Sequence, residues 1–395
     1  MIEKMPPRNR KRRISDDERI QITSARFDSI RTSGMVTPLA VLAKRFQRNE
    51  AVISRVIAQS LRAQFVEVRV LRDEDRAPER HADLERDLLR KYRGLLSAIV
   101  VGVKHPPDGP GSSEEALDYG DRVHQALGHA LSLEIARGTL IKNGEQLGVG
   151  PGRGVYETVR ALLHQPQLRA SGVTLVSLSG VGYLRHHARN RNLLLDPDFM
   201  VVFLSEAFEK PVVIDLVSSP IVVEAEKRSG GPIHRWLGSE DRNRRPLDTA
   251  ILGVGVLSPG NRFYQEATVS QPSAQEVIYQ PIREPLRALL RTAEQVSTPA
   301  YVPVGDLGYH LFFVPPPPDV SVPEESRLVI VRQIETINAR LLSAHEQDFK
   351  AMRSVVLVAG TECKARAMHH IITGDLAAVT HLCTDVFAAR VLRSS

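Results

Sequence analysis

Short apolar segments typical of β-strands alternate with amphipathic helical stretches through most of this 395-residue chain. Residues 95–103 and 173–180 are rich in β-branched side chains and have the length of buried strands. Between them, residues 114–137 place apolar side chains along one face of a long predicted helix. Alternating strands and helices are typical of an α/β domain with a largely parallel sheet, which is the fold class that we predict. Further strands are predicted at residues 146–149, 198–204, 211–217, 248–258, 307–314 and 354–361, and further helices at 80–92, 155–163, 282–296, 324–341 and 364–372.

The composition is typical of a globular protein that can bury a hydrophobic core. The chain is 42% hydrophobic and 25% charged, and a chain of this length supports two or three domains without disulfides or structural metals. Its two cysteines, Cys363 and Cys383, lack zinc-site spacing and indicate a reducing compartment. No apolar run reaches the roughly 18 residues of a membrane span, and the basic N-terminus has no secretory apolar segment behind it. We therefore expect a cytoplasmic protein with no membrane partner.

Positive charge is concentrated in the first 70 residues. They contain fifteen Lys and Arg against seven Asp and Glu, a balance of +8, whereas the whole chain carries +6, so that the remaining residues sum to −2. This asymmetry indicates a small module that meets a polyanion, joined to a nearly neutral body. The alternative is that the basic run at residues 8–13 is a solvated tail that accounts for much of the excess.

Residues 37–64 have the pattern of two short helices joined by a tight turn. Thr37–Pro38 suits the start of a helix over residues 39–46, and Asn49 suits the cap of a second helix. Residues 65–70 then alternate as a strand does. This order predicts a winged-helix-like helix-turn-helix, whose second helix enters the major groove of DNA. Helix pairs also occur as plain packing units, so the charge excess is what favours DNA binding.

In this interpretation, the outward face of the second helix contacts operator DNA. The candidate contacts to base edges or nearby phosphates are Asn49, Glu50, Ser54 and Arg55, and the candidates for neutralising phosphates are Arg48, Arg62 and the basic tail. We predict four segments: a basic disordered arm (residues 1–15), a helix-turn-helix domain (16–72), a helical linker (73–93) and the α/β domain (94–395).

Four predicted strands of the α/β domain are followed by glycine-bearing turns, GVGPGRG at 148–154, SGVG at 179–182, GVGVLSPG at 253–260 and AGTECK at 359–364. Ligands of parallel sheets bind beyond the carboxyl ends of the strands, so four such turns predict a small-molecule site. The loop 148–154 has neither the Lys-Ser/Thr ending of a phosphate-binding P-loop nor the GxGxxG spacing of a dinucleotide site, so no nucleotide cofactor is predicted. The adjacent histidine pairs 186–187 and 369–370 diverge on any regular element, which argues against a metal site.

The whole layout resembles the SorC family of bacterial transcriptional regulators, also described with the DeoR-type deoxyribonucleoside repressor. In the N-terminal part, residues 42–57 match the helix-turn-helix pattern of that family in register, with Glu50 in place of an arginine. In the body, the resemblance is carried by LGVGPGRG (147–154), DTAILGVG (248–255), VGDLGYHLFF (304–313) and VAGTECKARAMHHIITGDLAAVTHLCTDVFAARVL (358–392).

The resemblance implies a helix-turn-helix domain followed by a sugar-binding domain related in fold to ribose-5-phosphate isomerase and glucosamine-6-phosphate deaminase. It implies a sugar or sugar-phosphate effector, double-stranded operator DNA and a homo-oligomer, a dimer or tetramer, with no cofactor. The family places Ser or Thr at the positions of Gly150 and Gly154, which leaves open whether the effector is phosphorylated. The effector-binding residues implied are Gly148, Gly150, Gly152, Arg153, Gly154, Gly180, Gly182, Asp306 and Lys364.

Three functions are compatible with this pattern. The first is an effector-controlled regulator, in which a sugar shifts the equilibrium between conformations that bind DNA differently. The second is a sugar-phosphate isomerase or deaminase, for which Asp306 and Lys364 offer acid–base groups. The third is a degenerate regulator that binds no effector. The N-terminal module favours a regulator, because an enzyme has no need of it.

Overall fold

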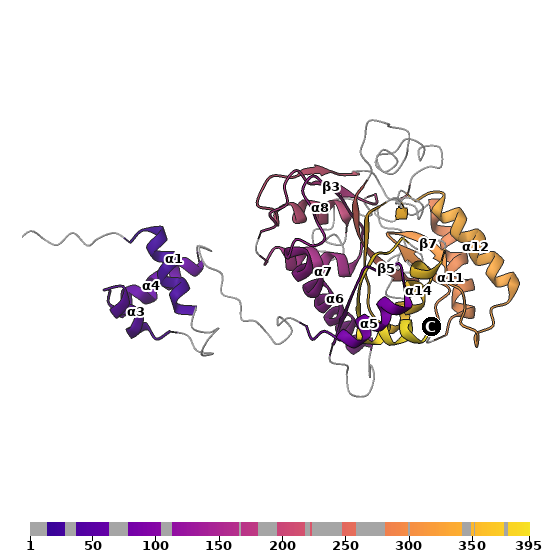
Figure 1. Ribbon diagram of the computed structural model, residues 1–395, viewed down its shortest axis with the longest axis horizontal. Helices are drawn as coiled ribbons and strands as arrows, with labels where there is room; N and C mark the ends of the chain where they lie inside the picture. The colour runs from indigo at the N-terminus through magenta and orange to yellow at the C-terminus, as the bar shows by residue number, and fades with distance from the viewer. Residues whose placement is uncertain are drawn as a thin grey trace, which may run out of the picture. The chain divides into compact units, whose positions relative to one another are not determined.

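A computed structural model describes residues 14–27, 37–62, 78–103, 113–165, 167–180, 196–217, 222, 247–257, 281–298, 301–341, 349–350, 352–374 and 378–395. The chain forms two compact units, Met1–Asp73 and Glu74–Ser395, and each is described by itself (Figure 1).

The first unit contains three helices, α1 (Asp16–Phe27), α3 (Leu39–Arg45) and α4 (Glu50–Arg62). They pack around a small core that includes Ile22 of α1, Leu42 of α3, and Ile53, Val56 and Ile57 of α4. Two short helices joined by a tight turn therefore lie where the sequence predicts them, and their binding to DNA stays a prediction. The strand predicted at residues 65–70 lies outside the described residues.

The turn between α3 and α4 is held by its own residues. Gln47 takes a left-handed backbone conformation with φ of 51°. Asn49 then caps α4, because its Oδ1 accepts a hydrogen bond of 2.8 Å from the amide of Val52. This is the N-cap that the sequence predicts at this position.

The second unit is built on a parallel sheet with the strand order β1-β9-β8-β5-β2-β3-β4. This confirms the predicted α/β class. The strands are β1 (Ser97–Val101), β2 (Gln146–Val149), β3 (Thr174–Ser177), β4 (Val213–Asp215), β5 (Thr249–Val256), β8 (Ser354–Val358) and β9 (His381–Asp385).

The end of strand β5 also pairs with a short antiparallel hairpin. Its last residues pair with β6 (Val304–Leu307), which forms a hairpin with β7 (His310–Phe313). The sequence predicts one strand over residues 307–314, and this prediction is wrong. The chain turns at Gly308–Tyr309, both with positive φ (61° and 73°). A tyrosine is rare in this conformation, so the turn carries no ordinary hairpin signal.

Helices cover both faces of the sheet (Figure 1). One face packs against α6 (Ser113–Ala136), α7 (Arg153–Leu162) and α8 (Pro197–Ser205). The other packs against α5 (Ala82–Lys91), α14 (Ala365–Thr373) and α15 (Val386–Ser394). A third cluster joins α11 (Arg283–Val296) and α12 (Glu324–Asn338) to the β6–β7 hairpin. Helix α5, in the segment predicted as a linker, buries Leu84 and Leu88 in the core of this unit.

Helix α8 corrects a second prediction, because residues 198–204 are predicted as a strand. A short apolar run does not by itself distinguish a buried strand from a buried helix. The decisive signal precedes the run: the Asp196 side chain accepts a hydrogen bond of 3.3 Å from the Asp198 amide, and Pro197 occupies the first turn. Both features initiate helices.

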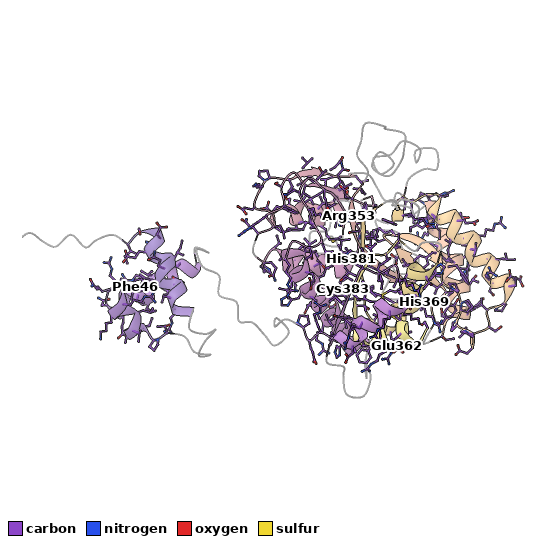
Figure 2. All side chains as sticks on the ribbon, viewed as in Figure 1. Phe46, Arg353, Glu362, His369, His381 and Cys383 are labelled. Atoms are coloured by element: carbon purple, nitrogen blue, oxygen red, sulfur yellow. The ribbon has the colours of Figure 1, made fainter. Side chains whose placement is uncertain are left out.

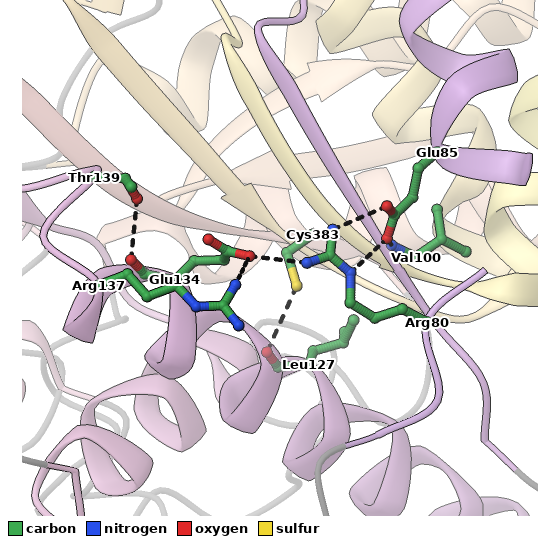
Figure 3. A network of polar contacts seen from close by, with 8 residues as sticks. All are labelled: Arg80, Glu85, Val100, Leu127, Glu134, Arg137, Thr139 and Cys383. Atoms are coloured by element: carbon green, nitrogen blue, oxygen red, sulfur yellow. Dashed lines mark hydrogen bonds and ion pairs between the residues drawn. The ribbon is translucent and has the colours of Figure 1, made fainter. Parts of the chain in front are cut away.

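An ion network joins α5, β1 and α6 (Figure 3). The Arg80 guanidinium donates to Glu85 of α5 and to Glu134 of α6, each at 2.8 Å. Glu85 also accepts from the Val100 amide of β1 at 3.0 Å. Cys383 lies buried beside this network, where burial raises the pKa of its thiol. These partners hold the β1 edge of the sheet to the helices on both faces.

Candidate functional site

The candidate site lies at the carboxyl ends of β2, β5, β8 and β9, where the chain leaves the sheet. The glycine loop follows β2 directly and ends in α7. Its Gly152 has φ of 130°, a conformation that side chains disfavour. The Gly150 amide donates to the Ile251 carbonyl of β5 at 2.9 Å, which fixes the loop against the neighbouring strand.

The other glycines of this loop serve close packing. A Cβ atom at Gly148 would lie 2.8 Å from the Leu178 side chain, and one at Gly150 would lie 2.7 Å from Leu252. A Cβ atom at Gly154 would lie 3.0 Å from the Val358 carbonyl oxygen of β8. The glycines therefore let the loop and the start of α7 approach β5 and β8. Side chains at positions 150 and 154, where the family resemblance implies Ser or Thr, would require Leu252 and Val358 to shift.

Arg153 is the first residue of α7 and forms an ion pair with Asp121 of α6. The two side chains are 43% and 45% exposed, so the pair is accessible to solvent. Asp121 therefore offsets part of the positive charge that Arg153 brings to the start of α7.

Lys364 follows β8 and contacts His124 of α6, with 3.2 Å between Nζ and Nε2. The Nδ1 atom of His124 lies 2.5 Å from the Gly120 carbonyl oxygen, which only accepts, so Nδ1 carries the proton and Nε2 accepts from Lys364. Burial and the neighbouring Lys364 charge hold the pKa of His124 well below its usual value. The neutral ring therefore orients the lysine without adding positive charge.

Asp306 of β6 is a buried carboxylate opposite Gly255 of β5 in the antiparallel ladder. A Cβ atom at Gly255 would lie 1.9 Å from Asp306 Oδ2, so the carboxylate occupies the space that a side chain would take. Burial lowers the pKa of Lys364, while the Asp306 charge acts in the opposite direction. The structure thus places Asp306 near Lys364, and the binding of an effector by the two residues stays a prediction.

Asp385, at the end of β9, is fully buried. Its Oδ1 caps α15 through the Ala388 amide at 2.9 Å and accepts from the Thr361 amide at 3.2 Å. Burial raises its pKa, opposed by these amides and by Lys364. Burial and the Asp385 charge also raise the pKa of Tyr119. Asp385 therefore caps α15 and also lies close enough to Lys364 to interact with its charge.

The structure therefore gathers Arg153, Asp306 and Lys364 at one edge of the sheet, next to the glycine loop. Gly180 is buried after β3, where its carbonyl oxygen lies 3.5 Å from Ser179 Oγ. Gly182 lies outside the described residues. No group of three or more His, Cys, Asp or Glu side chains suited to a metal occurs in the part of the chain that the structure describes.

Asp121 and His124, which approach from α6, were not predicted from the sequence. Their signal is weak, because both lie in a long amphipathic helix and only the fold shows that its first half passes the glycine loop. A cavity of about 220 Å³ lies elsewhere, between the second half of α6 and the sheet, with Leu131, Glu134 and Cys383 in its lining. None of the predicted effector-binding residues lines this cavity.

In the first unit, Asn49, Glu50, Ser54 and Arg55 are exposed at the start and along the outer face of α4. Arg48 forms an ion pair with Glu18 of α1 at 3.0 Å, and this carboxylate partly neutralises its positive charge. Arg62 ends α4, and its side chain lies outside the described atoms. Among the helices that the structure describes, none has the length and apolar character that a membrane crossing requires.

No protein-family model matches the sequence, and no curated protein is significantly similar to it. Solved structures do share its fold. A putative sugar-binding domain of a transcriptional repressor from Vibrio fischeri superposes with a TM-score of 0.52 at 16% identity, covering 80% of this chain and 98% of that one. A transcriptional regulator from Streptococcus pneumoniae TIGR4 gives 0.52 at 13% identity, covering 79% and 96%.

A probable sor operon regulator from Shigella flexneri gives a TM-score of 0.50 at 16% identity, covering 79% of this chain and 98% of that one. The larger unit therefore has the fold of domains found in sugar-binding transcriptional regulators, as the sequence analysis predicts. At these identities the likeness establishes the fold and leaves the ligand to be argued from the site itself.

Proposed function

We propose that this protein is a DNA-binding transcriptional regulator of the SorC type, whose operator binding is controlled by a sugar-like effector at the Lys364 site. The observation that carries the proposal is the convergence of Lys364, Asp306 and Arg153 at the carboxyl edge of a parallel sheet. Ligands of such sheets bind at this edge. The fold shared with regulator domains supports the same function.

The side chains at this edge suit a hydroxylated ligand. The Lys364 ammonium donates hydrogen bonds, and the Asp306 carboxylate accepts them. A sugar hydroxyl both donates and accepts, so that adjacent hydroxyls of one ligand bridge the two groups. His124 acts as a positioning residue, since its Nε2 atom holds the lysine.

The first unit supplies the surface for DNA. Its sequence carries the excess positive charge of the chain, and α4 exposes Ser54 and Arg55. A homo-oligomer would present two copies of α4 to the half-sites of an operator. Effector binding then changes operator affinity to the extent that it favours one conformation of the oligomer.

Electrophoretic mobility shift on the promoter regions next to the gene tests the DNA arm of the proposal. We expect Arg55→Ala to weaken operator binding about tenfold, since a base or phosphate contact of this kind contributes about 1–3 kcal/mol. Affinity falls steeply with salt, because phosphate contacts release counterions. Arg332→Ala is the matched control, because it removes one exposed positive charge from α12. Equal behaviour of the two variants would refute a role for α4 in DNA binding.

The enzymatic alternative is tested on the same protein. Asp306 and Lys364 would serve as the acid–base pair of a sugar-phosphate isomerase or deaminase. Incubation with aldose and ketose phosphates and with glucosamine 6-phosphate, followed by product analysis, detects such turnover. Turnover that Lys364→Met abolishes would replace the regulator hypothesis with an enzymatic one. Tight operator binding without turnover is the result that we expect.

A further inference from the structure

We infer that the ligand of the Lys364 site is an uncharged polyhydroxylated compound, a free sugar or a polyol, and that phosphate esters are excluded. This inference rests on the proposed function, because it specifies the ligand class of the same site. It is carried by the ion pair at the start of α7, by the carboxylates near Lys364 and by the packing of the glycine loop.

The amino end of α7 is the place where a phosphate would ordinarily bind. The first amides of a helix lack intrahelical partners and, with the helix dipole, attract anions. Here Arg153 opens α7 and is paired with Asp121, so the cation beside this helix end already has a carboxylate of the protein as its partner. A phosphate would have to displace Asp121 or bind beside it against like-charge repulsion.

The positive charge of Lys364 is likewise offset by carboxylates of the protein. Asp306 and Asp385 both lie near enough to act electrostatically on its ammonium group, and both are buried. His124 contributes no charge, because its ring is neutral. A phosphate dianion at this edge would therefore meet the Lys364 and Arg153 cations together with three carboxylates, those of Asp121, Asp306 and Asp385.

The hydrogen-bonding character of the site favours the same ligand class. Carboxylates accept hydrogen bonds and a phosphate dianion donates none, whereas each hydroxyl group of a polyol both donates and accepts. Positions 150 and 154 are glycines, packed closely against Leu252 and Val358, and so offer no side-chain hydroxyl to help hold a phosphate. Charge, hydrogen bonding and packing thus agree on a neutral, hydroxyl-rich ligand.

The first experiment uses inorganic phosphate as the probe, on the full chain at constant ionic strength with chloride as reference. We expect thermal denaturation of the wild type to show no phosphate-specific shift in Tm. Asp121→Asn frees Arg153 and should create phosphate stabilisation, which the double variant Asp121→Asn/Arg153→Gln loses. Asp83→Asn is the matched control, since it opens an exposed ion pair with Arg86 and should gain nothing. Phosphate stabilisation of the wild type that Arg153→Gln abolishes would overturn the inference.

The second experiment compares matched pairs by isothermal titration: ribose with ribose 5-phosphate, fructose with fructose 6-phosphate, and sorbitol with sorbitol 6-phosphate. We expect at least one neutral member to bind at least about tenfold more tightly than its ester, because each added charge meets the carboxylates of the site. Tighter binding of an ester, or binding of neither class, overturns the inference. Failure of the proposed function is distinct, because it shows as loss of operator binding in the mobility shift.

Discussion

At the amino ends of the strands, the Arg353 guanidinium donates to several acceptors of the fold, whereas at their carboxyl ends the Lys364 ammonium has one close hydrogen-bond contact and nearby charges. Arg353 donates to Glu145, to the Thr249 hydroxyl and to the Leu140 carbonyl. Figure 2 labels Arg353 and Glu362, which flank the two ends of β8. Lys364 contacts His124 at 3.2 Å, and the carboxylates act on it electrostatically.

We interpret the Arg353 cluster as structural and the Lys364 cluster as a binding site. A guanidinium that donates to a buried carboxylate, a hydroxyl and a carbonyl of the protein directs these hydrogen bonds into the fold, so we expect Arg353 to act mainly on stability. At the carboxyl ends, burial shifts the pKa of Lys364, His124 and Asp385, and such clustered shifts mark functional sites more often than structural ones. Four variants test this contrast, from the largest expected effect to the smallest.

Glu145→Ala should lower the free energy of unfolding by about 2–3 kcal/mol, because it removes a buried carboxylate that accepts from Arg353 and Thr249, while water partly screens the guanidinium left behind. Urea denaturation measures the loss, and ligand affinity should not change. Glu324→Ala opens an exposed ion pair with Arg327 and serves as control, with an expected change below about 0.5 kcal/mol. A similarly small change for Glu145→Ala would show that the Arg353 cluster does not stabilise the fold.

Lys364→Met should show the opposite pattern. The variant keeps the length of the side chain and removes its charge, so binding of the effector should weaken by about 2 kcal/mol, the usual contribution of a charge-assisted hydrogen bond. The free energy of unfolding should change by less than about 1 kcal/mol, because removing a desolvated charge offsets the lost contacts. Titration calorimetry and urea denaturation separate the two effects, with the exposed Lys350→Met as control. A large loss of stability with unchanged affinity would make Lys364 structural.

Gly154→Ala tests the packing of the glycine loop. The new methyl group meets the Val358 carbonyl and side chain, so we expect a loss of about 1–2 kcal/mol after the gain in helix propensity is counted. Gly120→Ala is the matched helical glycine, with nothing within 4 Å of its added Cβ. It should be neutral or stabilising by up to about 1 kcal/mol. Thermal denaturation compares the two variants. If Gly154→Ala were the more stable of the two, close packing would not require glycine at position 154.

His124→Gln should alter the pH dependence of stability. The folded state keeps this ring neutral, whereas the unfolded chain protonates it below its ordinary pKa of 6.5. Wild-type stability is therefore lost as pH falls below 6.5, and the variant should lose less, by up to about 1.4 kcal/mol per pH unit. His369 and His381 also have lowered pKa values and leave a residual slope. Urea denaturation between pH 7 and 5 measures both slopes, and equal slopes would mean that His124 is protonated in the folded state.

The turns after the strands, among them the loop 148–154 and the turn 359–364, were predictable from the sequence, because a parallel sheet brings the carboxyl ends of its strands to one edge. Asp306 and Lys364 as site residues came from the family resemblance. Asp121 and His124 were not identified, because nothing in a helical pattern indicates which turn passes a distant loop. Helix α8 and the β6–β7 hairpin were missed for local reasons, an unrecognised cap before α8 and a tyrosine in the left-handed region.

The contact between Gly255 and Asp306 has a consequence for how relatives of this protein diverge. A side chain at position 255 and a carboxylate at position 306 exclude each other, because they claim the same volume. The two positions are therefore expected to change as a pair in homologous sequences, and lineages that keep the aspartate should keep the glycine. Co-substitution at these two sites would trace where ligand preference changed during the history of the family.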